Sequence, residues 1–524
     1  AAYKWIKETD PSRAVQYEQA AQNDHTDVFC PMYYFPDLVE AYGKDSSKSK
    51  PLIQCEYAHA MGNSQGGFKE YWDLYRRYPN LQGGFIWDFV DQSIRWKTPE
   101  GKTIYGYGGD FNRYDASDNN FCDNGLVSPD RVPNPHMHEV GRIYQNIWTA
   151  PGDLTRGEVK IHNENFFRDL SGYELVWKLL KNGVPVRSGR IGNLDAAPQQ
   201  TTSVNIDFGK ICDCAEWILD ISYELKRPEG VLPVGYAVAR DQIVIRPFKP
   251  SEPVIANEAE KNIDVRLPEI VNTDKNYLIV KGDDFDVEFS RKDGFMTKYR
   301  AGKLDFLKDG ASLTPNFWRA PTDNDMGAGL PAKFAAWKTP AFKLKSLTGE
   351  LDAEGLAVVK AEYDMPDVSG KLIMTYVVNN VGEVKVTEDF KADASANVSD
   401  LYRFGMQMPM PAEFDEIEFY GRGPGENYAD RNNSADLGLY RQKVADQFYP
   451  YIRPQETGNK TDIRYWRQLD KSGDGLEIVA AAPFSASALN YTIESLDDGE
   501  EKEQRHSELV EKADLTNLLI DKAQ

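Results

Sequence analysis

Over residues 1–147, short and continuously apolar runs alternate with stretches whose apolar residues recur at helical spacing. Continuous apolar runs are typical of strands that are buried on both faces, and strands separated by helices pair in parallel with the helices outside. In folds of this kind the residues that carry chemistry lie at the carboxyl ends of the strands. The runs predict strands at 13–18, 26–34, 51–56 and 83–91.

Two amphipathic helices complete this first region. Phe68, Tyr71, Trp72 and Tyr75 recur at positions i, i+3, i+4 and i+7, which places their side chains on one face of a helix. A second helical pattern over 138–148 closes the region. The pattern therefore predicts a parallel sheet covered by helices.

The second region, 148–250, changes to an alternation of apolar and polar residues, which predicts strands with one buried face. Asn182–Gly183 lies between two such runs and is a signal for a two-residue hairpin turn. Seven or so short strands in about a hundred residues predict an immunoglobulin-like β-sandwich.

A segment rich in proline and glutamate predicts a linker over 251–275, before the third region. Residues 276–524 again show many strand patterns and few helical ones. This stretch is too long for a small sandwich and predicts two broad antiparallel sheets packed face to face. The full length of 524 residues also exceeds what one core accommodates, which favours several domains.

Composition narrows the classes of protein. The net charge is −21, and because a nucleic-acid binder needs a basic face, we expect no nucleic-acid partner. No apolar run approaches the roughly 18 residues of a membrane helix, so no membrane partner is expected. Five cysteines do not form a disulfide framework. His136 and His138 lie beside Glu139, but no further cluster of ligands favours a metal there.

Carboxylates and aromatic residues at strand ends are the chemistry that the pattern offers. The sequence has no phosphate-binding loop, dinucleotide fingerprint, GxSxG elbow or HExxH motif. Cleavage of a glycosidic bond needs two carboxyl groups, one that attacks or activates water and one that protonates the leaving oxygen. The candidates at the ends of predicted strands are Glu56, Glu18, Tyr33 and either Asp88 or Asp91.

Five longer motifs make the reading more specific. They are PLIQCEYAHAMGNSQGGFKEYW (51–72), YPNLQGGFIWDFVDQS (78–93), YGYGGDFNRYDASDNNFCDNGLVSPDR (105–131), FWRAPTDNDMG (317–327) and YGRGPGENYADR (420–431). These motifs resemble the large bacterial β-galactosidases of glycoside hydrolase family 2, in the family's order and over essentially the whole chain. The residues that follow Glu56 are similar to the galactosidase branch rather than to the β-glucuronidases or β-mannosidases.

The resemblance implies a fold and a reaction. Residues 1–147 would be the C-terminal half of a (β/α)8 TIM barrel, 148–250 the immunoglobulin-like sandwich, and 276–524 a large antiparallel β-supersandwich of the galactosidase small-chain type, truncated at its C-terminus. The implied activity is the release of terminal β-D-galactose from β-galactosides such as lactose, with retention of configuration.

The resemblance also implies roles for individual residues. Glu56 corresponds to the nucleophile at the end of barrel strand seven, and the other matched positions are those of residues that contact the sugar or a sodium ion. The implied substrate-binding residues are Tyr33, Glu56, Tyr57, His59, Trp87 and Asn124, and the implied sodium ligands are Asn124 and the carbonyl oxygen of Phe121. The family also uses magnesium, but most of its magnesium ligands precede the first residue of this sequence.

The second carboxyl group is where this chain departs from the family. The family's acid/base is a glutamate after an asparagine at the end of strand four, and the chain begins after that strand. An asparagine followed by a glutamate occurs only at Asn163–Glu164 and Asn257–Glu258, and neither of these lies at a predicted barrel strand end. Glu18 ends a predicted strand but does not match the motif. We therefore expect a partial enzyme without its acid/base and with low activity in isolation.

Two alternatives stay open at this stage. The chain could be a non-catalytic carbohydrate-binding or scaffolding protein, or a family 2 enzyme that is specific for another sugar. In each reading the expected partner is a β-galactoside or another oligosaccharide, and the resemblance suggests a homo-oligomer.

Overall fold

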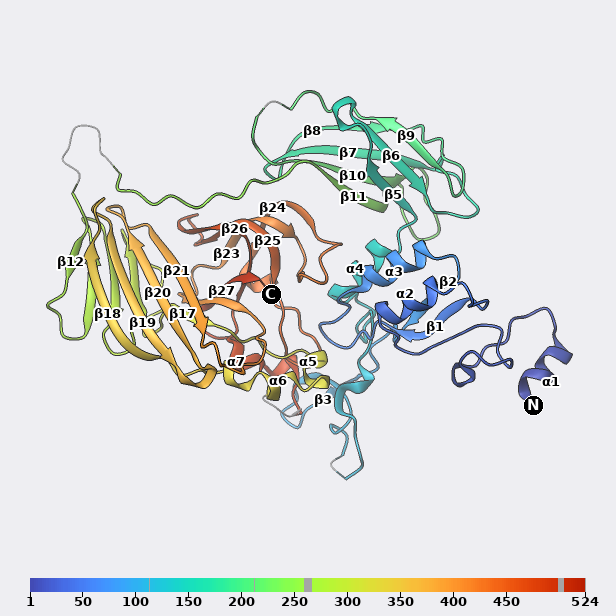
Figure 1. The fold of residues 1–524 in the computed structure, drawn as a ribbon, viewed down its shortest axis with the longest axis horizontal. Coiled ribbons are helices and arrows are strands. Elements are labelled where there is room, and N and C mark those ends of the chain that lie inside the picture. The colour runs from blue at the N-terminus through green and yellow to red at the C-terminus, as the bar shows by residue number, and fades with distance from the viewer. Residues whose placement is uncertain (113, 212, 259–265, 498–503, 524) are drawn as a thin grey trace.

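The computed structural model describes residues 1–112, 114–211, 213–258, 266–497 and 504–523. Figure 1 shows three regions: helices around a small sheet (blue), a β-sandwich above them (teal to green), and a larger β-structure beside both (yellow to red). The described chain after the sandwich crosses to the far side of the third region. No helix in the described part of the chain is long and apolar enough to cross a membrane.

The first region has four helices and four short strands. β1 and β2 pair in parallel, and β3 and β4 form an antiparallel hairpin. A cluster of buried apolar side chains lies between the β1–β2 pair and helices α2, α3 and α4. The elements are α1 (Ala2–Thr9), α2 (Pro36–Lys44), β1 (Leu52–Tyr57), α3 (Phe68–Arg77), β2 (Leu81–Ile86), β3 (Ile94–Lys97), β4 (Thr103–Gly106) and α4 (Pro135–Ile143).

Single backbone bridges widen the β1–β2 pair. On one side, Phe29 and Met32 bridge in parallel to Leu52 and Glu56 of β1. On the other side, the chain beyond β2 bridges in parallel to Val127. Four adjacent segments therefore run in the same direction, with helices on one face. The described residues form part of a parallel sheet and do not close a barrel.

Two of the predicted strands are wrong or reduced. The segment 13–18 is not a strand, because the amide of Val15 donates to Asp27 Oδ2 (2.8 Å) instead of to a neighbouring strand, and a 3₁₀ turn follows. The segment 26–34 keeps only single bridges, because Pro31 has no amide hydrogen and Tyr33 has a positive φ of 50°.

Other boundaries shift by a few residues. The strand predicted at 83–91 begins at Leu81 and ends at Ile86. The helix predicted at 138–148 begins at Pro135, a residue suited to the first helical turn, and ends at Ile143. The strand at 51–56 and the helix that carries Phe68 to Tyr75 are confirmed.

The second region contains seven strands in two antiparallel sheets that share one apolar core. The predicted turn is confirmed: Asn182 (φ 47°) and Gly183 (φ 78°) connect β7 to β8, as a type I′ hairpin turn requires. The sheet orders are β11-β10-β7-β8 and β5-β6-β9, with β5 (Ile147–Pro151), β6 (Glu158–Asn163), β7 (Tyr173–Lys181), β8 (Val184–Ile191), β9 (Thr201–Asn205), β10 (Trp217–Leu225) and β11 (Ala237–Arg246).

The third region has three antiparallel sheets around one large apolar core. Its first strand, β12 (Glu269–Val271), falls inside the range predicted as a linker, part of which lies outside the described residues. The five-stranded sheet is β12 to β16 in sequence order, with β13 (Tyr277–Lys281), β14 (Phe285–Ser290), β15 (Met296–Ala301) and β16 (Leu304–Asp305).

The other two sheets of this region contain four and seven strands. The four-stranded sheet has the order β18 (Lys343–Leu351), β19 (Ala357–Met365), β20 (Gly370–Val378) and β21 (Val384–Ala392). The seven-stranded sheet has the order β17 (Thr314–Asn316), β22 (Phe404–Met410), β27 (Thr516–Ala523), β26 (Gly475–Leu489), β25 (Lys460–Leu469), β23 (Glu416–Gly423) and β24 (Asp436–Lys443). Short helices are α5 (Asp323–Gly327), α6 (Leu330–Lys333) and α7 (Ile493–Leu496).

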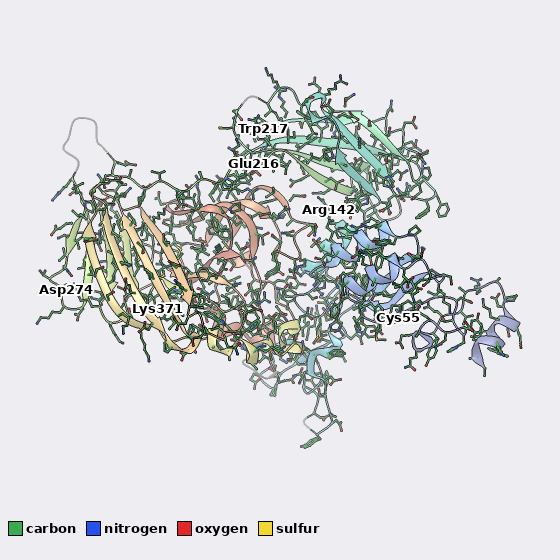
Figure 2. All side chains as sticks on the ribbon, viewed as in Figure 1. Cys55, Arg142, Glu216, Trp217, Asp274 and Lys371 are labelled. Atoms are coloured by element: carbon green, nitrogen blue, oxygen red, sulfur yellow. The ribbon has the colours of Figure 1, made fainter. Side chains whose placement is uncertain are left out.

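Buried and half-buried ion pairs connect the regions. Arg464 of β25 donates two hydrogen bonds, of 2.8 and 3.0 Å, to the carboxylate of Glu216 next to β10. Arg142 of α4 lies 3.3 Å from Asp436 of β24. Figure 2 shows Arg142 between the first region and the sandwich, and Glu216 on the side of the sandwich that faces the third region. The third region therefore has a fixed place beside the parallel sheet.

Candidate active site

Glu56 lies near the carboxyl end of β1, on the partly exposed side of the strand. Leu52 and Gln54 are fully buried on the helix side, where the Gln54 side chain donates to the hydroxyl of Tyr75 (2.9 Å). Strict alternation would place Glu56 on that same side. The register between β1 and β2 shifts between Gln54 and Tyr57, and this irregularity turns Glu56 away from the helices.

Tyr33 approaches Glu56 at two points. The amide of Tyr33 donates to the backbone carbonyl of Glu56 at 2.8 Å, and the Tyr33 hydroxyl lies near enough to the Glu56 carboxylate for that carboxylate to raise its pKa. Burial, together with this carboxylate, raises the pKa of Tyr33 well above its usual value. The phenol therefore stays protonated.

His59 lies between two aromatic rings that come from different segments. Its ring is perpendicular to that of Tyr33, with 6.2 Å between centroids, and is tilted toward that of Phe121 at 5.5 Å. Ala58, just before it, has a positive φ of 48°, which turns the chain sharply after the strand. The turn brings His59 back beside the residue that holds Glu56.

Trp87 is next to the same turn. Its amide donates to the carbonyl of Tyr57 (3.2 Å), and its carbonyl accepts from the amide of Ala60 (2.8 Å). The side chain is 38% exposed, so an aromatic face remains open beside the end of β1. Aromatic faces of this kind cover the apolar side of a sugar ring.

Asn124 and Phe121 provide the oxygen atoms that were predicted to bind sodium. The Asn124 side chain is almost fully buried, and its Nδ2 donates to the carbonyl oxygen of Phe121 (2.5 Å). Its Oδ1 has no hydrogen-bond partner among the described atoms. A buried amide oxygen beside a backbone carbonyl is a neutral oxygen pair, which fits a hard monovalent cation.

Comparisons with known proteins identify the family. Three family models match: "Glycosyl hydrolases family 2, TIM barrel domain" over residues 1–149, "Beta-galactosidase, domain 4" over 159–246 and "Beta galactosidase small chain" over 281–524. The chain belongs to glycoside hydrolase family 2. Within this family, it corresponds to the three consecutive domains that these models match.

Curated relatives support the same assignment. The chain is 34% identical over 500 residues to a beta-galactosidase of Priestia megaterium. This match covers 94% of this chain and 47% of the relative. It is 34% identical over 519 residues to the beta-galactosidase BgaC of Bifidobacterium adolescentis, with 95% and 48% covered. A beta-galactosidase of Streptococcus thermophilus is 31% identical over 547 residues, with 99% and 51% covered. The chain spans about half the length of these relatives.

Tyr57 lies on the helix side of β1. Its side chain is fully buried between β1 and the helices, and its hydroxyl lies 3.0 Å from the indole nitrogen of Trp72 and 3.1 Å from the hydroxyl of Tyr144. This position argues against the predicted contact with substrate. The same shift of register that turns Glu56 outward turns Tyr57 inward.

Two buried aspartates were not predicted as site residues from the sequence. Asp91 was noted only as a possible strand end, and Asp123 was not noted. Burial raises the pKa of Asp91 to about 7 and that of Asp123 to about 6, and like charge adds to each shift, from Asp123 at Asp91 and from Asp323 at Asp123. Both line a cavity of about 210 Å³ between the first and third regions, together with Asp323. Burial at a domain contact leaves no sequence signal.

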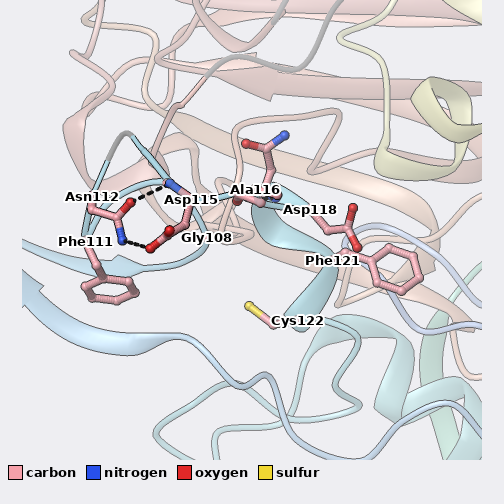
Figure 3. Close-up of a pocket in the computed structure, with 11 residues that line it drawn as sticks. Gly108, Phe111, Asn112, Asp115, Ala116, Asp118, Phe121 and Cys122 are labelled. Atoms are coloured by element: carbon pink, nitrogen blue, oxygen red, sulfur yellow. Dashed lines mark hydrogen bonds between the residues drawn. The ribbon is translucent and has the colours of Figure 1, made fainter.

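A second hollow lies beside Phe121. It has a volume of about 460 Å³ and is lined by residues of the segments 108–112 and 115–122 (Figure 3). Within it, Asn112 Oδ1 accepts from the amide of Asp115, and Asn112 Nδ2 donates to the Asp115 carboxylate (2.9 Å). The described residues hold no group of three or more histidine, cysteine or acidic side chains placed to bind a metal.

Proposed function

We propose that this chain is the part of a retaining β-galactosidase that carries the nucleophile, Glu56. The observation that supports this most is the pairing of Glu56 with Tyr33 on the open side of β1, with Trp87 and His59 beside it. A carboxylate that is oriented by a neighbouring phenol is what a glycosyl-transferring nucleophile needs.

The reaction has two displacements. In the first, a carboxylate oxygen of Glu56 bonds to the anomeric carbon of galactose, the bond from that carbon to the leaving oxygen breaks, and an acid protonates that oxygen. In the second, water attacks the same carbon, a base takes the proton of the water, and Glu56 is released as a carboxylate. Trp87 would support the sugar ring and His59 would bind its hydroxyls.

The acid and base of these steps is proposed to come from a residue outside this sequence. Glu164 does not serve, because its carboxylate accepts from Arg76 Nε (2.7 Å) and Trp148 Nε1 (2.9 Å) where α3 meets the sandwich. Glu258 lies in the segment after the sandwich, where its amide donates to Asn380 (2.8 Å). Glu18 opens the short 3₁₀ turn that replaced a predicted strand.

Sodium is proposed to bind at Asn124 and the carbonyl of Phe121. When bound there, it would supply a fixed positive charge that orients hydroxyl oxygens of the sugar. The residues themselves hold the loop 121–124 against the end of β2, where the amide of Asp88 donates to the carbonyl of Asn124 (2.7 Å). Magnesium and assembly into a homo-oligomer stay predictions.

Trapping the intermediate tests the proposal. The protein in its full natural form would be incubated with a 2-deoxy-2-fluoro-β-galactoside that carries an activated leaving group, and the labelled peptide would be identified by mass spectrometry. We expect the label on Glu56, no label in Glu56→Gln, and unchanged labelling in Glu164→Gln as a control carboxyl. A label on another residue would disprove the assignment. Faster labelling by the corresponding mannoside or glucuronide would show that the enzyme prefers that sugar to galactose.

A further inference from the structure

The loop that follows Glu56 is covered by the third region. Asn63 is 8% exposed, and all its described hydrogen bonds go to residues more than 360 positions away. Its amide donates to Gln455 Oε1 (2.9 Å). Its side-chain Nδ2 donates to the hydroxyl of Tyr428 (2.8 Å) and to the carbonyl of Glu456 (2.8 Å). The three N–H groups of Asn63 are thus all bonded to the third region.

Neighbouring loop residues are held in the same way. Arg431 donates to the carbonyl of Ser64 (2.8 Å), and the amide of Gly67 donates to the carbonyl of Asp430 (2.9 Å). At Gly62, which has a φ of +59°, an added Cβ would lie 2.4 Å from Asp323 Oδ2. The side chains of Asp323 and Gln455 therefore pack against the Gly62 backbone more closely than any side chain larger than that of glycine allows.

The partners of the loop are themselves fixed. Gln455 Nε2 donates to Asp323 Oδ2 (2.9 Å), and Arg431 donates to Glu426 (2.9 Å). Tyr428 is 6% exposed, and burial raises the pKa of its hydroxyl, so this group stays protonated. Buried hydrogen bonds that are fully paired hold one arrangement, because breaking one leaves a buried polar group without a partner.

We infer that Asn63 and Tyr428 are positioning residues for the chemistry at Glu56, an inference that rests on the proposed function. His59 lies three residues after Glu56 and four before Asn63, so the loop that presents His59 is attached to β1 at one end and to the third region at the other. A displacement of about 1 Å at a reacting centre costs on the order of 10²-fold in rate. The motif 420–431, which ends with Tyr428 to Arg431, thereby acquires a role in catalysis without touching substrate.

The test measures the rate at which Glu56 is trapped. Tyr428→Phe, Asn63→Ala and the double variant would be made in the full natural form of the protein, with Tyr376→Phe as a matched control. Tyr376 is a fully buried tyrosine of the same region whose hydroxyl has no hydrogen-bond partner among the described residues. Labelling by the 2-fluoro-galactoside, kcat, KM and the melting temperature would be compared.

We expect each single variant to slow labelling of Glu56 and to lower kcat by about 10-fold, with a smaller change in KM, because positioning acts on the chemical step. The double variant should be no slower than Asn63→Ala, since Tyr428 acts through Asn63. The control should keep the labelling rate. If Tyr428→Phe labels Glu56 as fast as the control at a similar melting temperature, the contact is only structural and the inference is overturned. A label away from Glu56 would overturn the proposed function and this inference with it.

Discussion

Tyr33 is bonded to Glu56 through its backbone, and its side chain lies beside the carboxylate of the same residue. The amide of Tyr33 donates to the carbonyl of Glu56 at 2.8 Å, while its hydroxyl meets the carboxylate of the same residue. The positive φ of Tyr33 makes this double contact possible, because it turns the side chain out of the plane of the adjacent strand. The proposed nucleophile is thus held by a neighbour in the sheet rather than by a residue of its own loop.

Tyr33→Phe removes only the hydroxyl and should slow the formation of the glycosyl-enzyme on Glu56. Hydrogen bonds to a charged partner contribute about 1.5–3 kcal/mol, which corresponds to about 10- to 100-fold in rate if the whole contribution is made in the transition state. The measurement is the rate of labelling of Glu56 by the 2-fluoro-galactoside. Tyr34→Phe is the matched control, because the Tyr34 ring packs against Phe29 at 5.8 Å. Equal rates in the two variants would contradict the proposed role of the hydroxyl.

Local patterns predicted the elements around the site but not its contacts. The strand at 51–56 and the helix after it follow from apolar runs and helical spacing, which are properties of neighbouring residues. The outward turn of Glu56 depends on a register shift between two strands, and alternation along one strand cannot reveal it. The predicted strand at 13–18 failed for a similar reason, since the Asp27 side chain took the hydrogen bond of Val15.

Contacts between the regions could not be predicted from local sequence patterns. Asn63 and Tyr428 stand 365 positions apart, and each has an ordinary local sequence. Only the resemblance drew attention to both of their motifs, and it gave no reason why they occur together. The buried Asp91 shows the same limit, because its environment is formed by residues such as Asn134 that are distant in sequence.

Asp91 should make the protein less stable as the pH rises. Its native pKa, raised by burial to about 7, exceeds the unfolded value of 3.8. Between about pH 4 and pH 7 the native state therefore keeps a proton that the unfolded state has released, and the free energy of unfolding falls as the pH increases. At 1.36 kcal/mol per pKa unit, the loss attributable to Asp91 is at most about 4 kcal/mol.

Asp91→Asn checks this pH dependence. The amide can still accept from the amide of Gly125, which donates to Asp91 at 2.7 Å, but it does not ionise. Urea unfolding of the wild type and the variant at pH 4.5 and pH 8 should show a smaller loss of stability in the variant. If the wild type and the variant instead show the same change of stability between these two pH values, Asp91 is ionised in the folded protein throughout.

Gly183→Ala should destabilise the contact between the sandwich and the third region. An added Cβ would lie 2.7 Å from the ring of Tyr420 and 3.0 Å from the amide of Leu439, in addition to the strain of a φ of +78°. Gly235 has a φ of +80° and no atom within 4 Å of the added Cβ, so Gly235→Ala isolates the strain. We expect about 1–2 kcal/mol for Gly235→Ala and at least twice that for Gly183→Ala, measured by chemical denaturation. Equal losses would show that the turn does not press on Tyr420.

The last prediction concerns the 524-residue chain produced alone, which should hydrolyse lactose poorly or not at all. A retaining mechanism needs a second carboxyl about 5 to 5.5 Å from the nucleophile, and the glutamates with a matching sequence, Glu164 and Glu258, lie elsewhere. General acid–base catalysis contributes roughly 10² to 10⁴-fold, and lactose has a poor leaving group that depends on it. An aryl galactoside with an activated leaving group needs less acid assistance, so it should still label Glu56 while release of the sugar stalls.

The exposed face of the parallel segments should limit this chain as well. Phe85, within β2, and Phe89, beyond it, are 61% and 62% exposed, so apolar surface is open to solvent and should favour aggregation. Supplying the rest of the protein, in the same chain or as a separate one, should raise both solubility and the turnover of lactose. The comparison is between the isolated chain and the full natural form, assayed on lactose and on an aryl galactoside. Lactose turnover by the isolated chain near the full rate would show that a carboxylate within these residues acts as the acid, and Glu18→Gln would then be the first variant to test.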